Sequence, residues 1–185
     1  MLLLNGQSKK TLAAILATTI GMIFALIFFK IMSALVHIDG LSSAEAEGLI
    51  LVNEGTGLQI KDVLFAGVLI SSLGAIMDVG MSIVSALYEV YLHNPTLNKR
   101  EIFHSGIEIG KDMIGTMTNT LILAFVGSAF ITLLVFISYQ VQFDQLISSN
   151  YLCIEIAQGI CGTFGIVLTI PAASAIMAGL LTRKH

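Results

Sequence analysis

The sequence predicts an all-α integral membrane protein, a helical bundle with four transmembrane helices and one short extracytoplasmic interfacial helix. Of its 185 residues, 56% are hydrophobic and only 11% are charged, whereas soluble domains have about 45–50% apolar and about 25% charged residues. The mean hydropathy is +0.91, and four apolar segments each exceed the roughly 20 residues that span a bilayer. The expected environment is therefore a lipid bilayer. The sequence has no basic stripe or arginine-rich run, so nucleic acid is not an expected partner.

We expect a single transmembrane domain over residues 1–185, with spans at about 12–36, 63–92, 113–138 and 151–181. Lys30, near the end of the first span, is expected to reach the interface as an anchor. In the loop that follows, Ser42 and Glu45 have the spacing of a capping box. That spacing predicts the interfacial helix, near Ser42–Val52.

The later spans are bounded by proline and by polar residues. Pro95 breaks the chain after the second span, because proline lacks a backbone donor and disfavours helix in the preceding residue. The next helix is expected to begin near Glu101 in the interface and then to cross the membrane. Residues 139–150 are expected to form a short loop, and Pro171 predicts a kink in the last span.

Orientation follows from lysine and arginine, which are enriched in cytoplasmic segments. One side of the four-span arrangement carries six of the nine basic residues: Lys9, Lys10, Lys99, Arg100, Arg183 and Lys184. Both termini are therefore predicted to be cytoplasmic.

Three helices carry polar or small residues at steps of three and four, which places them on one face of each helix. The first stripe comprises Ser71, Ala75, Asp78, Ser82, Ser85 and Glu89. The second comprises Ser105, Glu108, Asp112, Thr116 and Asn119. The third, weaker stripe comprises Glu155, Gln158, Gly162, Gly165 and Thr169. A GxxxG pair, Gly106 and Gly110, predicts close approach of another helix.

Asp78 is the strongest candidate for a functional residue. A carboxylate at the bilayer centre costs roughly 2.5–3.5 kcal/mol on insertion scales, so it is expected to face protein or water. The functional interpretation is a proton or cation site; the alternative is an Asp that hydrogen-bonds helices together. We expect Asp78 and Asn119 to face one polar cavity, with Ser82 and Thr116 between them. Asn119 itself fits a path and helix packing equally well, whereas Thr118 and Thr120 fit packing better.

The remaining candidates are expected near the membrane interfaces. Lys111 is a possible partner for Glu89 or Asp112 at a cytoplasmic mouth, although a solvated rim explains these charges more simply. Glu155, about one turn inside the last helix, either marks the outer end of a path or snorkels to the interface.

The runs GVLISSLGAIMDVGMSIVSALYE, HNPTL and SGIEIGKDMIGTMTNTLILAFVGS resemble the YibE/F-like family of bacterial multipass membrane proteins. The similarity extends from about Asn5 to Leu181. It implies a multipass protein of the bacterial cytoplasmic membrane. Family members usually have further apolar helices before a segment such as NGQSKKTLAAILAT. The resemblance therefore implies a homo-oligomer, or a second membrane chain that supplies the missing helices.

We expect a transporter or channel subunit that moves an ion or small solute along a path lined by the polar stripes around Asp78. The alternative is a structural or assembly subunit of a membrane complex without transport of its own. An intramembrane enzyme using Asp78 and Asp112 is disfavoured, because the sequence lacks a nucleophile or metal-binding frame. We expect no enzymatic activity, no cofactor and no metal site.

Overall fold

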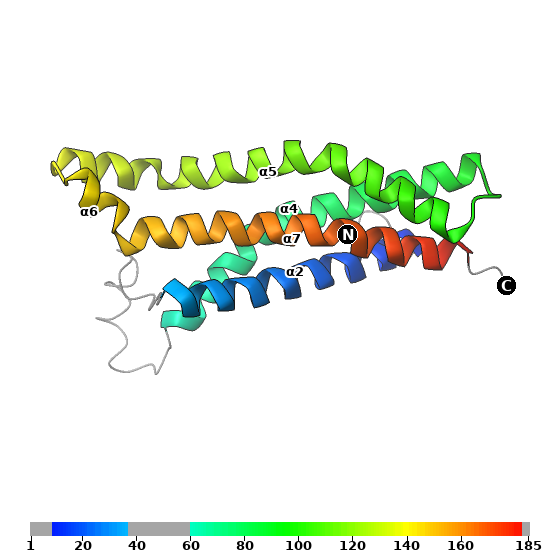
Figure 1. Ribbon diagram of the computed structural model, residues 1–185, viewed down its shortest axis with the longest axis horizontal. Helices are drawn as coiled ribbons and strands as arrows, with labels where there is room; N and C mark the ends of the chain where they lie inside the picture. Colours follow the sequence, from blue (N-terminus) through cyan, green and yellow to red (C-terminus); the bar gives the residue numbers. More distant parts are fainter. Residues whose placement is uncertain (1–8, 37–59, 183–185) are drawn as a thin grey trace.

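The computed structural model describes residues 9–36 and 60–182, which form four long helices and one short helix (Figure 1). The helices are α2 (Lys9–Val36), α4 (Ile60–His93), α5 (Lys99–Ser138), α6 (Phe143–Ile147) and α7 (Asn150–Thr182). The four long helices are all long and apolar enough to cross a membrane. The predicted all-α membrane fold is confirmed. The interfacial helix predicted near residues 42–52 lies outside the described residues.

The long helices run alternately up and down, so their ends gather at two ends of an elongated bundle (Figure 1). We call the end where α2 and α5 begin and α4 and α7 end the basic end, because Lys10, Lys99 and Arg100 lie there. The opposite end, which carries α6, we call the far end. At the basic end α4 and α5 are joined by a short turn, and toward the far end they separate (Figure 1).

Helix α7 is the centre of the bundle, since its contacts with α2, α4 and α5 are the most extensive among the described helices. Its contacts with α2 and α4 are made by small residues. A methyl group added at Gly21 of α2 would overlap the Thr169 hydroxyl. A methyl group added at Gly165 of α7 would lie 2.6 Å from Cδ1 of Ile76 in α4. A methyl group added at Gly80 of α4 would lie 3.2 Å from Oγ1 of Thr18 in α2. The absence of side chains lets the three backbones approach closely.

Helix α5 approaches α7 through the predicted GxxxG pair. An added methyl group at Gly106 would overlap Ser174 of α7, and one at Gly110 would overlap Ile170 of α7. Gly106 also contacts α4, since a methyl group added at Gly106 would lie 2.9 Å from Cδ1 of Leu87 in that helix. The pair lets α7 approach closely, as the sequence predicts, and it also brings α4 into contact near the basic end.

The turns at the two ends of α5 have different causes. At its start, Asn98 accepts hydrogen bonds from the amides of Arg100 and Glu101, while the Glu101 carboxylate accepts one from the Asn98 amide. This is a complete capping box. At its end, Gln140 has a positive φ of 53°, which reverses the chain as glycine does after many helices. Residues 143–147 of the predicted loop form α6, a single short helical segment.

We expect Gly110→Leu to destabilise the bundle by about 1–3 kcal/mol, because the larger side chain must displace Ile170 of α7. The measurement is thermal unfolding of the purified chain in detergent, followed by loss of helical circular dichroism. Gly115→Leu is the matched control, since nothing lies within 4 Å of a Cβ placed there. Equal stability of the two variants would contradict the close contact between α5 and α7.

Candidate functional site

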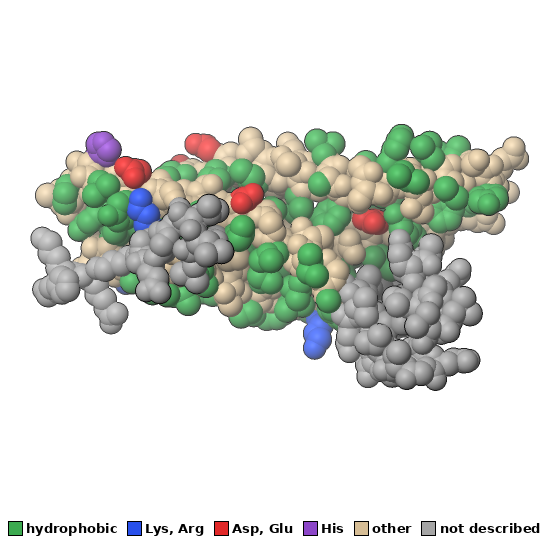
Figure 2. Space-filling view, turned by 180° about the vertical axis from the view of Figure 1, so that it is seen from behind, with side chains coloured by type: hydrophobic (Ala, Val, Ile, Leu, Met, Phe, Trp, Pro, Cys, Tyr) green, Lys and Arg blue, Asp and Glu red, His purple; other side chains and the backbone are tan. Residues whose placement is uncertain are grey.

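The first stripe lies on the outside of the described bundle. Asp78, Ser82 and Glu89 are exposed, and Ser85 is half-buried. The opposite face of α4 is buried against α2 and α7, through residues such as Ile76 and Val79. A helix turns about 100° per residue, so Asp78 is rotated about 160–200° around the axis of α4 from Ile76 and Gly80. Because Ile76 and Gly80 face the bundle, Asp78 faces outward. Figure 2 shows acidic side chains spread along the length of the rear face rather than gathered at one end.

The second stripe also faces away from α7. Asp112, Thr116 and Asn119 are all exposed. Asp112 and Asn119 lie two and nine residues after Gly110, which contacts α7. These steps turn both side chains about 160–200° away from α7. Thr116 lies six residues after Gly110 and is turned about 120° away. The small residues that bind α5 to α7 therefore place the polar residues on the opposite side.

Asp78 and Asn119 lie at similar heights in the bundle. Asp78 is 15 residues from the end of α4 and Asn119 is 20 residues from the start of α5, so their heights differ by roughly 8 Å. Both, however, are on the surface of the single chain, as are Ser82 and Thr116. Neither of the two cavities described below is lined by any of these four residues. A polar cavity shared by Asp78 and Asn119 would need a further wall in addition to the described helices.

The third stripe divides into two parts with different surroundings. Gly162, Gly165 and Thr169 are buried in helix contacts, and the Thr169 hydroxyl donates to the carbonyl of Gly165 at 2.7 Å. This part packs helices together. Glu155 is instead half-buried and lines a cavity of about 410 Å³ between α5 and α7.

Charged groups at the basic end form two local sets. Lys10 of α2 lies 3.6 Å from a Glu89 carboxylate oxygen, and its ammonium lies 3.8 Å from the centre of the Tyr88 ring. On α5, Lys111 donates to Glu108 at 2.7 Å, with His104 4.0 Å away from the same oxygen. Lys111, a possible partner for Glu89 or Asp112 on the sequence alone, instead pairs with Glu108, because Glu108 lies one turn before Lys111 on the same face of α5.

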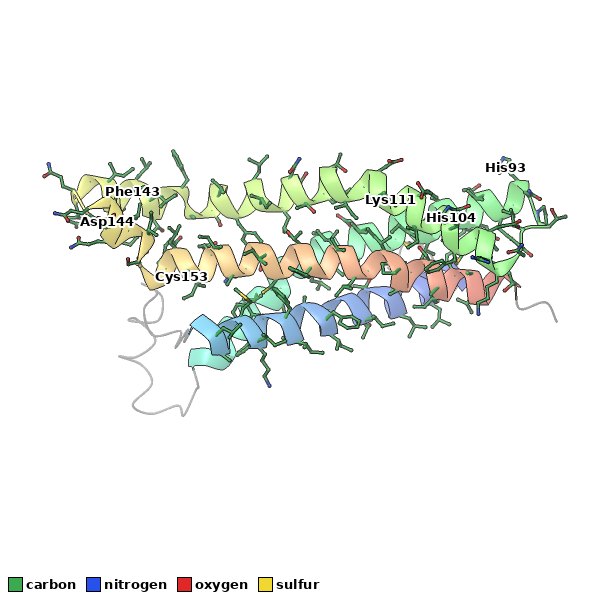
Figure 3. All side chains as sticks on the ribbon, viewed as in Figure 1. His93, His104, Lys111, Phe143, Asp144 and Cys153 are labelled. Carbon is green, nitrogen blue, oxygen red and sulfur yellow. The ribbon has the colours of Figure 1, made fainter. Side chains whose placement is uncertain are left out.

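Figure 3 shows that the side chains of His104 and Lys111 lie toward the basic end of α5, whereas Asp144 lies on α6 at the far end. A second cavity, of about 880 Å³, opens at the basic end beside Arg100, Phe103 and His104. The backbone amides at the start of α5 already bind the Asn98 side chain. The amides of Arg100 and Glu101 are therefore already occupied and do not offer an anion site. Within residues 9–36 and 60–182, no group of three or more His, Cys, Asp or Glu side chains has the arrangement of a metal site.

The sequence analysis missed the 410 Å³ cavity between α5 and α7. Apart from Glu155, its walls include Thr118, Phe125, Gly159 and Phe164, which belong to no polar stripe. Only the small residues Ala129 of α5 and Gly159 of α7, which both line the cavity, were a possible signal. Apolar residues of this kind also cover lipid-facing surfaces, so their pattern does not distinguish a cavity wall.

Comparison with known proteins places the chain in a family without adding an activity. Neither a search of curated proteins nor a search of solved structures found a match. The family described as YibE/F-like protein matches residues 1–183, nearly the whole chain. The chain belongs to the YibE/F-like family of membrane proteins.

Proposed function

We propose that the chain is a subunit of a transporter or channel, and that an ion or small solute moves along the first and second stripes around Asp78. The observation that supports this most directly is the exposure of Asp78 on α4, opposite the face that packs in the bundle. Because a carboxylate in hydrocarbon is costly, this face is best satisfied by water or by polar groups of another chain. The path then lies at the interface of two chains.

Several neighbours fit a path of this kind. Ser82 and Ser85 continue the line from Asp78 toward the basic end, where Glu89 is 60% exposed. On α5, Thr116 and Asn119 offer hydroxyl and amide oxygens, the ligands that suit hard cations. Asp112 and Glu89 place carboxylates near the mouth at the basic end, where Lys10 pairs with Glu89.

We further propose that the chain lies in a bacterial cytoplasmic membrane with the basic end in the cytoplasm. The support is the concentration of Lys10, Lys99 and Arg100 at this end, together with Arg183 and Lys184, which follow α7 in the sequence. On this orientation, the mouth near Glu89 and Asp112 is cytoplasmic.

A structural or assembly subunit is the second candidate. It is favoured by the same outward position of Asp78 and Asn119, because exposed polar side chains in lipid also bind partner helices through hydrogen bonds. In that case the stripes are sealed by a partner and no solute passes.

We expect Asp78→Asn to reduce proton or cation flux at least about tenfold in liposomes that contain the purified chain. The substitution keeps the side-chain size but removes the charge that exchanges the ion. Asp144→Asn, which removes an exposed acid on α6, is the matched control and should retain full flux. Unchanged flux in Asp78→Asn would exclude Asp78 from the path. Absence of flux in the unaltered chain, when incorporated with its partner, would favour the assembly subunit.

We expect Ser82→Cys to form intermolecular disulfides in native membranes after mild oxidation, because a second chain covers the first stripe. The variant is made in a chain whose Cys153 and Cys161 are replaced by serine and alanine. Gly127→Cys, at an exposed position of α5 outside both stripes, is the control. Cross-linked species of twice the chain mass indicate a second copy, and other masses indicate a different chain. Equal cross-linking at both positions would contradict a partner on the first stripe.

Labelling from the two sides of the membrane tests the orientation. In the same cysteine-free chain, we expect Thr96→Cys to react with an impermeant maleimide only after the cells are opened. Gln145→Cys on α6 is expected to react in intact cells, since α6 lies at the far end. The opposite pattern would reverse the orientation, and reaction of both sites from one side would contradict a four-span arrangement.

A further inference from the structure

The ammonium group of Lys10 lies on the last carboxylate of the first stripe. Its Nζ atom is 3.6 Å from Oε1 of Glu89 and 3.8 Å from the centre of the Tyr88 ring. Lys10 belongs to the start of α2, whereas Glu89 and Tyr88 belong to the end of α4. The contact therefore joins two helices, and it brings a positive charge of the chain itself to the mouth at the basic end.

The two partners hold this ammonium in different ways. Tyr88 is half-buried and packs against the hydrophobic core, so its ring has a fixed position. Glu89 is 60% exposed, while only 29% of the Lys10 side chain is exposed. Ion pairs with an exposed carboxylate are weak and exchange readily with solvent ions, whereas an aromatic face continues to attract the cation. The ammonium can therefore leave Glu89 and remain over the Tyr88 ring.

The position of Lys10 determines the charge that the mouth presents to solution. With Lys10 in place, the negative charge of Glu89 is compensated by its partner. Fixed charges at an opening concentrate ions of the opposite sign, over a distance of about 10 Å at 0.1 M salt. Ser85 lies one turn before Glu89 on the same stripe, about 6 Å along the helix. The field of this pair therefore reaches into the path.

We propose that Lys10 is a tethered cation that occupies Glu89 and sets the charge preference of the mouth. This inference rests on the proposed path around Asp78. A small cation that enters at the basic end displaces the Lys10 ammonium from Glu89, and the ammonium remains over the Tyr88 ring until the ion has passed. Lys10 thus competes with the ions that the path carries, and it limits how strongly the mouth attracts them.

The test measures the charge preference of the mouth by a reaction that needs no transport. Ser85→Cys, in the cysteine-free chain in nanodiscs, is reacted with a cationic and with an anionic methanethiosulfonate. We expect Lys10→Met, which keeps a long apolar side chain, to raise the ratio of cationic to anionic rates at least about threefold at about 0.1 M salt. Glu89→Gln should lower this ratio, and the double variant should return it toward the original value.

Two matched variants and the direction of each change decide the result. Lys10→Arg keeps the charge, and Lys30→Met removes one toward the other end of α2; both should leave the ratio unchanged. Equal ratios in Lys10→Met and Lys30→Met would overturn the proposal. A shift of Glu89→Gln in the same direction as Lys10→Met would also overturn it, because a purely structural role moves both variants alike. If Ser85→Cys is unreactive, Ser82→Cys at its exposed position replaces it.

Cation flux in liposomes tests the consequence for the path. Lys10→Met should raise the flux at least about twofold, because the mouth then keeps an uncompensated carboxylate. Asp78→Asn in the same chain should abolish the gain. Flux that is present but unchanged in Lys10→Met would overturn the role of Lys10 at the mouth. Absence of flux in every variant, together with a shifted reactivity ratio, would support the occupation of Glu89 by Lys10 and count against the proposed path alone.

Discussion

Close backbone contact with α7 is the constraint on which the rest of this structure depends. Lipid tails are as apolar as leucine, so helices in a membrane associate through van der Waals packing between small residues. Here Gly21 and Gly80 meet Thr169 and its surroundings, and Gly110 meets Ile170. These contacts use one face of each surrounding helix. They therefore decide which residues of each helix remain outside.

The residues left outside are unusual for a surface that faces lipid. The outer half of α5 exposes large apolar residues such as Leu123 and Ile131, as a lipid-facing surface should. The first and second stripes instead expose Asp78, Asp112 and Asn119. In hydrocarbon, each of these groups needs a polar partner. The described helices therefore pack a shared core while they leave these polar faces on the outside of the bundle.

The sequence is sufficient to predict the four helices, because long apolar segments and the breaks around Pro95 have few alternative interpretations. The contact of Gly106 with another helix is predictable for the same reason, since GxxxG has a specific geometric use. The central position of α7 is not predictable from the sequence. A pattern of glycine and threonine at steps of three and four, as in Gly165 and Thr169, is compatible with a polar path and with a packing face. Only the contacts of the folded chain distinguish them.

Asp78 and Glu155 show why residue type alone did not separate the candidate sites. Both are acids within membrane-spanning helices. Asp78 lies on an outward face of the described bundle, whereas Glu155 lines a cavity between α5 and α7. The small residues Gly159 and Ala129 are part of the lining of this cavity, where α5 and α7 pass each other. Two carboxylates in one bundle thus have different chemical surroundings, because small residues determine where helices touch and where they leave space.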